Sequence, residues 1–503
     1  MSDTFNFEKE QEEFGKRPDV QATAKQIKEI VDEITKKAGI MGRDRLMEMG
    51  VIEKPEPKRE RIVLMSRFTP KPYADEILSQ IRFVRDKYNR FWRYDVADGI
   101  WKEDASDYIR KILREKLLGD EMLKNRYIEE IVSHIRDTTW NTNYDTTAPD
   151  NIIAFNNCLY NIDTDEIMEF IPKYFITTKI PIDLDPMYNS CDVIDSFFEE
   201  CVGKENKSIL YELIAYTLIR RYPYQKFFIL FGKGQNGKSV YLNLIRKFLG
   251  ISNVSSESPQ NLVTNRFSRS SLWNKLANIG SDIPYINLIN TNTIKELTGE
   301  DYTPCERKYR ESFPFRNYAK LIWSANELPQ VTDKTHAFYR RVYIIKFENE
   351  VKKPDPQLLD KITTKSQLMG LAWVCKNILK KLKENNYVFS INPSVHEMER
   401  LYEELSNPIK RFIRENLIHE VNSKIPKWEF KDRFIVWLRQ NGFRIWSEKE
   451  IGHVMKELYP ETRMEMPFEV LNEYGKTELK IKLIRAWDGL KWKESHTPKI
   501  DQK

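Results

Sequence analysis

The stretch Gly232-Lys-Gly-Gln-Asn-Gly-Lys-Ser239 decides the fold of the central part of this 503-residue chain. An apolar run, Phe227–Phe231, precedes it, and residues 240–249, which have helical periodicity, follow it. A strand, a glycine-rich loop and a helix in this order are the context of a phosphate-binding loop. The glycines tolerate positive φ, which lets backbone N–H groups wrap around phosphate oxygens. An ordinary glycine turn is the alternative, and the flanking strand and helix argue against it.

Each side chain of such a loop has an expected task. Lys238 should reach the β- and γ-phosphates of a nucleotide, and the Ser239 hydroxyl should hold Mg²⁺. We therefore expect ATP and Mg²⁺ as cofactors. The expected nucleotide-binding residues are Gly232, Lys233, Gly234, Gln235, Asn236, Gly237, Lys238 and Ser239.

Two polar side chains stand at the ends of apolar segments downstream of the loop. Lys275–Asp282 resembles a buried strand that ends in a carboxylate, so Asp282 is the candidate for a second Mg²⁺ ligand. Lys320–Asn326 is another apolar strand, and Asn326 is a candidate to hydrogen-bond the γ-phosphate or the attacking water. Both residue types are also common in turns and caps, so position alone assigns neither role.

Apolar segments at 227–231, 276–280, 320–324 and 342–347 alternate with helical segments, which predicts a mostly parallel, doubly wound sheet. Arg340 and Arg341 stand just before the last of these strands. Paired arginines most often form a solvated face. In a ring ATPase, however, a cation at this place can reach the phosphate of the neighbouring subunit.

The composition excludes several classes of protein. The net charge is only +6, from 81 basic and 75 acidic residues, so a polyanion site must be a local patch. The five cysteines form no CxxC pair, which argues against a zinc site and a disulfide framework. No apolar run approaches a membrane span, and the polar start lacks a signal peptide core. We expect a soluble protein of the cytoplasm, without a membrane partner.

The C-terminal unit has the pattern of a winged helix. Residues 428–438 have helical periodicity, and Ser447–Glu450 is a capping box that opens a second helix. Strand-like runs near 466–471 and 479–484 then form a candidate wing. The basic residues available there for DNA phosphates are Lys449, Lys456, Lys480 and Lys482. Winged helices also dock proteins, and that alternative stays open.

Four stretches together resemble the superfamily 3 helicases, in particular the phage and plasmid primase-helicases and their poxvirus relative. They are GKGQNGKS at 232–239, SDIP at 281–284, residues 295–301 with 306–309, and KLIWSANELP at 320–329 followed by FYRRVYIIKF at 338–347. Their order and compact spacing are those of the superfamily. The likeness extends to residues 156–164 and 175–181, which resemble the small domain before the ATPase, and to residues 427–492, which resemble its terminal winged helix.

The resemblance implies a multidomain α/β protein with an AAA+-like phosphate-loop core, an N-terminal α+β domain and a C-terminal winged helix. The expected units are a charged arm at 1–66, the α+β domain at 67–200, the ATPase core at 201–350, a helical region at 351–424, the winged helix at 425–492 and a tail at 493–503. The implied catalytic residues are Lys238, Asp282 as the Walker B acid, Asn326 as the sensor, and Arg340 or Arg341 as a finger acting on the neighbouring subunit.

One departure from the family bears on the catalytic acid. Many members carry two adjacent acids where this chain has Ser281-Asp282, so which carboxylate polarises the attacking water is left open. Glu300 or Asp301 contributes only if its loop folds back toward the phosphates.

The family also places a hairpin before the sensor strand inside the channel of a hexamer. Here that hairpin carries Arg307, Lys308, Tyr309 and Arg310, and basic residues around an aromatic ring can grip a phosphate backbone and a base together. An ordinary solvated hairpin is the alternative. Within the resemblance, Lys308 is the strongest candidate for a DNA contact.

The function implied is that of an ATP-dependent replicative DNA helicase of a virus, plasmid or other mobile element, acting as a homo-hexameric ring inside a host cell. A DNA-melting initiator or loader and a nucleotide-switched DNA-binding regulator are the alternatives. About 65 residues precede the helicase-like region, too few for a primase-polymerase domain, so a primase or polymerase partner would act in trans.

Overall fold

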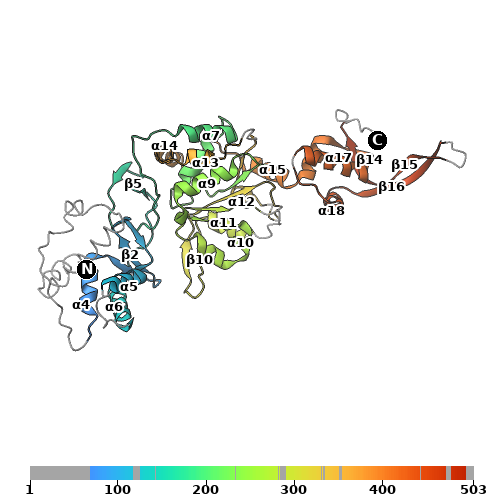
Figure 1. Ribbon diagram of the computed structural model, residues 1–503. Coiled ribbons are helices and arrows are strands. Elements are labelled where there is room, and N and C mark those ends of the chain that lie inside the picture. The colour runs from blue at the N-terminus through green and yellow to red at the C-terminus, as the bar shows by residue number, and fades with distance from the viewer. Residues whose placement is uncertain are drawn as a thin grey trace.

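The computed structural model describes most of the chain. The described residues are 68–116, 125–141, 143–232, 234–280, 283, 291–329, 331, 333, 335–349, 354–441, 443–471 and 477–493. The arm expected at 1–66, Lys233 and Asp282 lie outside them, as does nearly all of the expected tail. The described units follow one another along an elongated molecule, with the N-terminal helices and the β15–β16 ribbon at opposite ends (Figure 1).

A five-stranded parallel sheet forms the centre of the molecule. In spatial order its strands are β13 (Val342–Lys346), β7 (Phe227–Phe231), β12 (Lys320–Ala325), β9 (Ala277–Gly280) and β8 (Val254–Ser255). Every strand pair in it is parallel. The prediction of a mostly parallel sheet is therefore confirmed, and the mixed α/β architecture is consistent with a phosphate-loop core.

Alternate side chains of the central strands enter two separate cores, because successive residues of a strand point to opposite faces. Phe228 and Leu230 pack into one cluster, and Phe227 and Ile229 pack into the other. The helices contributing to the first cluster are α7 (Asp192–Val202), α8 (Lys207–Thr217), α9 (Lys238–Leu249), α13 (Leu358–Ile362) and α14 (Lys365–Glu384). Those contributing to the second are α10 (Pro259–Thr264), α11 (Asn292–Thr298), α12 (His336–Tyr339) and α15 (Val395–Ser406). Burial on both faces explains the continuous apolar runs of these strands.

The N-terminal unit has a core of its own. It contains α4 (Lys71–Gln80), the antiparallel strands β1 (Phe83–Arg85), β2 (Phe91–Asp95) and β3 (Ile100–Lys102), α5 (Ala105–Lys116) and α6 (Asn125–Thr138). Helix α6 buries Ile128, Ile131, Val132 and Ile135, which line one face at helical spacing.

A second small sheet connects this unit to the central one. Its strands are β4 (Ile152–Ala154), β5 (Leu159–Asn161) and β6 (Glu166–Met168). Ile153, Phe155 and Tyr160 pack in the same apolar cluster as α8 and α14. The segment after residue 151 thus shares the core of the central sheet, whereas α4 to α6 do not.

The C-terminal unit combines helices with a long antiparallel ribbon. Its elements are α16 (Pro408–Asn416), β14 (Leu417–Pro426), α17 (Lys427–Gln440), α18 (Glu448–Leu458), β15 (Glu461–Leu471) and β16 (Thr477–Trp492). The capping box predicted at Ser447 and Glu450 is present at the start of α18. The ribbon β15–β16 projects beyond β14 (Figure 1) and exposes Leu479, Ile481 and Leu483.

Within the described residues, no helix is both long and apolar enough to cross a membrane. All five cysteines are buried and have free thiols.

Candidate active site

The loop between β7 and α9 has the backbone geometry that its glycines predicted. Gly234 and Gly237 have φ of 108° and 83°, values that side chains with a Cβ rarely adopt. A Cβ on Gly237 would lie 2.4 Å from Cys201 Sγ, and one on Gly232 would lie 2.5 Å from the backbone oxygen of Phe347. Close approach therefore requires glycine at 232, conformation requires it at 234, and both require it at 237.

The ammonium group of Lys238 is held at the mouth of this loop. It donates to the backbone oxygen of Gly232 at 2.5 Å, to Asn236 Oδ1 at 3.2 Å and to Asn326 Oδ1 at 3.0 Å. The residue is only 5% exposed. Asn236 is in turn fixed by its amide, which donates to Phe347 O at 2.7 Å. The lysine is therefore positioned in the folded chain before any phosphate arrives.

Two of the predicted catalytic side chains come together here because their strands are neighbours. Asn326 directly follows β12, which pairs with β7 along its length. Parallel strands end at the same edge of a sheet, so the loop after β7 and the amide after β12 meet. Asp282 lies outside the described residues, and its role stays a prediction. Its described neighbours along the chain, Gly280 and Ile283, both pair with β12.

The residues present fit a nucleoside triphosphate with Mg²⁺. Twelve-residue helix α9 begins at Lys238, so its first N–H groups face the loop, and they favour an anion. Ser239 is exposed in the first turn of α9. Among the described residues no group of three or more His, Cys, Asp or Glu could hold a metal. Mg²⁺ needs no such cage, since it keeps several waters and uses one or two protein ligands beside the phosphates.

Arg340 and Arg341 lie at the opposite edge of the sheet from the loop. They precede β13, whose first residue Val342 pairs with Phe227 at the start of β7. A five-residue strand at about 3.3 Å per residue puts roughly 13–17 Å between the two edges. The Arg341 side chain is buried and donates to Ala337 O at 2.8 Å, whereas Arg340 is exposed. Neither arginine can therefore touch phosphates held by the loop of its own chain.

The alternative acids Glu300 and Asp301 also lie at this far edge. Glu300 Oε1 accepts a hydrogen bond of 2.8 Å from the backbone of Tyr222, and Asp301 lies close enough to influence Arg341 electrostatically. Their loop does not fold back to Lys238, so the hypothesis that either acid helps at the phosphates is wrong for this conformation.

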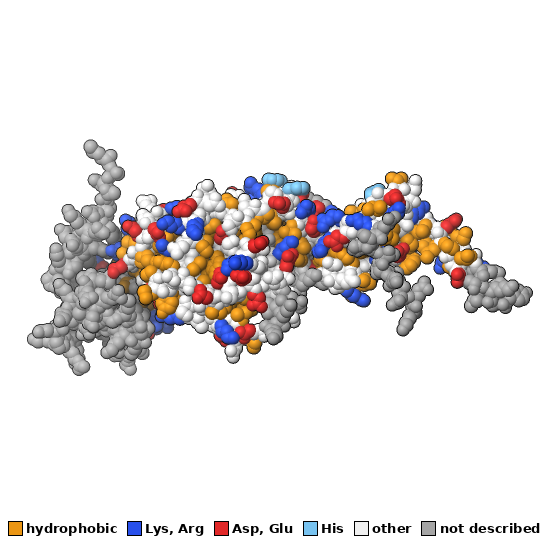
Figure 2. All heavy atoms as spheres, turned by 90° about the horizontal axis from the view of Figure 1, so that it is seen from above, with side chains coloured by type: hydrophobic (Ala, Val, Ile, Leu, Met, Phe, Trp, Pro, Cys, Tyr) orange, Lys and Arg blue, Asp and Glu red, His pale blue; other side chains and the backbone are white. Residues whose placement is uncertain are grey.

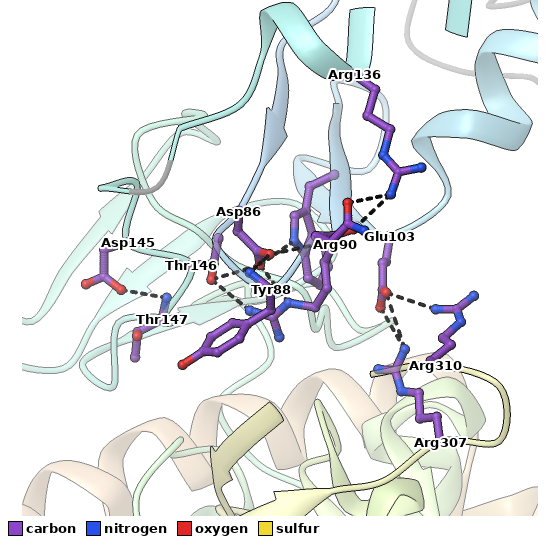
Figure 3. Close-up of polar contacts among 12 residues, drawn as sticks. Asp86, Tyr88, Arg90, Glu103, Arg136, Asp145, Thr146, Thr147, Arg307 and Arg310 are labelled. Carbon is purple, nitrogen blue, oxygen red and sulfur yellow. Dashed lines mark hydrogen bonds and ion pairs between the residues drawn. The ribbon is translucent and has the colours of Figure 1, made fainter. Parts of the chain in front are cut away.

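The hairpin predicted to contact DNA consists of β10 (Tyr302–Cys305) and β11 (Phe313–Arg316). Tyr309 at its tip is fully exposed with φ of 62°, and Lys308 is exposed beside it. Arg307 and Arg310 instead form ion pairs of 3.2 and 3.1 Å with Glu103, which follows β3 (Figure 3). Two of the four predicted contacts are thus already engaged by the N-terminal unit.

Beside these ion pairs, Arg90 of the N-terminal unit packs against Trp273 and Phe313 of the central unit. We call this contact the aromatic joint. Arg90 donates to Asp86 at 2.6 Å and to Thr146 at 3.0 Å (Figure 3). Its guanidinium lies 5.1 Å from the ring centre of Trp273 and 4.6 Å from that of Phe313. Sequence reasoning missed this joint, because its partners lie some 180 or more positions apart in the chain and follow no local period.

The four C-terminal lysines all lie on exposed faces. Lys449 and Lys456 stand on the side of α18 opposite Ile451 and Met455, which are buried. Lys456 lies 3.7 Å from Glu461. Lys480 and Lys482 lie along the projecting part of β16. On the molecular face in Figure 2, basic and acidic side chains are interspersed, so any polyanion contact depends on local clusters such as these.

Comparisons with known proteins agree with the motifs. Residues 81–203 match a family model described as D5 N terminal like, and residues 230–341 match a family of unknown function, DUF5906. "Putative helicase 121R" of Invertebrate iridescent virus 3 is 25% identical over 306 residues, 54% of this chain and 31% of the relative. "Putative helicase L207/L206" of Acanthamoeba polyphaga mimivirus is 25% identical over 258 residues, 49% of this chain and 26% of the relative.

A third viral relative covers more of the chain, and one solved structure aligns with it. "Putative helicase 184R" of Invertebrate iridescent virus 6 is 21% identical over 387 residues, 66% of this chain and 38% of the relative. The apo structure of the NrS-1 C-terminal region aligns with 84% of this chain and 99% of its own, at 14% identity and a TM-score of 0.40. The chain spans about a quarter to two fifths of the length of the viral relatives. These matches confirm the resemblance to the superfamily 3 primase-helicases, because the chain is similar both to the D5 N terminal like model and to viral proteins named as putative helicases.

Proposed function

We propose that this chain is an ATP-dependent replicative DNA helicase of a virus, plasmid or other mobile element, and that it works as a hexameric ring. The observation that carries the proposal is the contact of Lys238 with Asn326, which brings the phosphate loop and the sensor strand to one point. A buried ammonium beside a glycine cradle and a strand-end amide is an arrangement suited to phosphoryl transfer to water.

The chain's own residues would contribute positioning and charge. Lys238 exchanges the carbonyl and amide oxygens that now hold it for phosphate oxygens, and Asn326, released from the lysine, orients the attacking water. Ser239 and Asp282 are the residues that would hold Mg²⁺, which when bound neutralises the phosphates. Because these groups stand in place before the reaction, little reorganisation opposes it.

An arginine from the neighbouring subunit would complete the site. Arg340 is our candidate, because it is exposed at the edge of the sheet opposite its own phosphate loop. Arg341 is tied to Ala337 and serves better to hold the end of α12. The separation of finger and loop within one chain supports a mechanism in which each ATP lies between two subunits.

DNA would run through the centre of the ring past Lys308 and Tyr309, while the C-terminal unit binds DNA outside it. The order helix, strand, helix, helix and ribbon in α16 to β16 supports a winged helix, with Lys449 and Lys456 on its second long helix and Lys480 and Lys482 on its wing.

Strand displacement on a forked DNA tests the proposal. The wild-type chain should unwind the fork with ATP, and Lys238→Ala should not. Lys247→Ala, an exposed lysine on the same helix α9, is the matched control and should unwind normally. Electron microscopy with nucleotide and DNA should show six-fold rings.

Other outcomes would favour the alternatives. Melting of a duplex without continued unwinding would favour an initiator or loader. Nucleotide-dependent DNA binding with no melting at all would favour a regulator and would refute the helicase proposal.

A further inference from the structure

A cleft of about 720 Å³, lined mostly by polar and charged residues, lies between the N-terminal and central units, away from the phosphate loop. Its walls come from segments far apart in the chain: the β2–β3 turn and β3, the extended segment near 177–181, the turn before β9, and the loop of the β10–β11 hairpin. None of these segments carries a residue of the ATP site, so the phosphate loop does not account for the cleft.

Four cations line the cleft and one carboxylate faces it. The cations are Lys102, Lys179, Lys275 and Arg307, and the carboxylate is Asp98. Lys102 pairs with Asp95 at 2.7 Å, Lys179 lies 3.6 Å from Asp98, and Arg307 pairs with Glu103. Carboxylates therefore fix three of the cations in the walls, so they need not be ordered when a ligand binds.

Lys275 is the cation whose charge is least compensated. In the described structure its ammonium donates to the backbone oxygen of Ser252, a neutral acceptor. The side chain is half-buried, and burial lowers its pKa. An anion in the cleft would offset this desolvation of the charged form.

The rest of the wall suits a sugar–phosphate backbone better than an apolar ligand or a stacked base. Hydroxyl and amide side chains surround the cations: Asn156, Thr177, Ser252, Asn253, Ser270, Ser271 and Asn274. Trp273 is the aromatic residue of the lining, and guanidinium groups of Arg307 and Arg90 lie 4.3 and 5.1 Å from its ring centre. Two cations already lie over this ring, so the cleft offers charge rather than stacking.

The cleft and the hairpin tip are neighbours. Arg307 belongs to the cleft wall, and the next residue, Lys308, is exposed at the tip. A nucleic acid strand in contact with Lys308 would therefore lie one residue away from Arg307, the nearest cation of the cleft.

We propose that this cleft binds the sugar–phosphate backbone of single-stranded DNA, independently of base sequence, as it passes the hairpin. That the ligand is a nucleic acid strand is inferred from the proposed function. That the cleft binds an anion is inferred from its cations alone. A free nucleotide shares the same phosphate chemistry and is distinguished below.

The test measures binding of a fluorescent oligo(dT) of about 20 nucleotides to the full chain without ATP, over a series of salt concentrations. Removing one cation that neutralises a phosphate lowers the log–log slope on single strands by about 0.7, so Lys179→Gln/Lys275→Gln should lower it by up to about 1.4. Lys275→Arg keeps the charge and should keep the slope. Lys247→Gln, exposed on α9 and not among the residues that line the cleft, is the control and should also keep it.

An unchanged slope in the double variant would overturn the cleft proposal. If Lys308→Ala lowered the slope in the same assay while the double variant did not, DNA binding at the hairpin would be supported and only the cleft proposal would be refuted. A slope lowered equally in Lys275→Arg would point to structural damage and would also overturn it. Displacement of the oligonucleotide by an equal concentration of dTMP would show a site for free nucleotides and would overturn the strand assignment, whereas no displacement supports it.

Discussion

The phosphate loop and the β10–β11 hairpin each present a lysine, but the two lysines are prepared in different ways. Lys238 is 5% exposed and is held by three oxygens of its own unit. Lys308 is exposed at a hairpin tip, and the arginines on either side of Tyr309 and Lys308 are tied to Glu103 of another unit. Adjacent strands thus preform the proposed ATP site, while the proposed DNA contact at the hairpin depends on how two units are joined.

The largest loss of ATPase activity should come from replacing Arg340, the arginine proposed to act on the ATP bound by the neighbouring subunit. Arginine fingers contribute about 10³–10⁵ in rate, so Arg340→Ala should reduce ATPase by that order. Mixing it with inactive Lys238→Ala protein should restore part of the activity in mixed rings. Arg341→Ala, which removes a buried group, should instead lower thermal stability. No recovery with either arginine variant, despite proven mixing of subunits, would show that the site lies within one chain.

Removing the preformed lysine should have the next largest effect. Lys238→Ala deletes a charge positioned for the phosphates, and loss of one such preorganised group costs about 10²–10³ in kcat. The fold should persist, because the side chain contacts polar atoms rather than an apolar core. A steady-state ATPase assay with Lys247→Ala as control measures this. Near-normal ATP turnover by Lys238→Ala would contradict the assignment of residues 232–239 as a phosphate-binding loop.

A third lysine, Lys226, sharpens the comparison because it is buried beside a like charge. Burial, and then Arg340, lower its pKa to about 8. The unfolded chain therefore binds more protons than the folded one between about pH 8 and the ordinary lysine pKa, so stability rises with pH through this window. Lys226→Met should abolish that rise and stabilise the chain at pH 7, by at most about 3 kcal/mol. Urea unfolding at pH 7 and 9.5 measures the free energy of unfolding of the wild-type and Lys226→Met proteins. An equal change with pH in both proteins would refute the lowered pKa of Lys226.

The smallest effects concern the hairpin and test whether the joint restrains it. Lys308→Ala should make the salt dependence of binding to single-stranded DNA shallower by up to about 0.7 in log–log slope. Glu103→Gln should make it steeper, because it releases Arg307 and Arg310 for phosphates. The partly exposed ion pairs contribute only about 0–1 kcal/mol to folding, so the variant should unfold near the wild-type temperature. A shallower slope in Glu103→Gln would show that the glutamate aids DNA binding.

The local elements of the ATP site could be predicted because their signals are short. The apolar run at 227–231 became β7, and the glycines after it adopt the positive φ that they permit. Strands expected at 276–280, 320–324 and 342–347 became β9, β12 and β13 within two residues at each end. The ribbon β15–β16 is longer than its apolar runs indicated, since cross-strand pairing continues through charged residues such as Arg463 and Arg485.

The phosphate loop, its strand and helix, and the family resemblance could all be predicted from the sequence, because glycine conformation and apolar periodicity act over a few residues. Which charges meet depends instead on how the chain packs in three dimensions. Strand order brought Asn326 to Lys238 and left Arg340 at the far edge, and docking of the N-terminal unit brought Glu103 to the hairpin. Pairings of this kind depend on contacts across tens to hundreds of residues, and no local pattern encodes them.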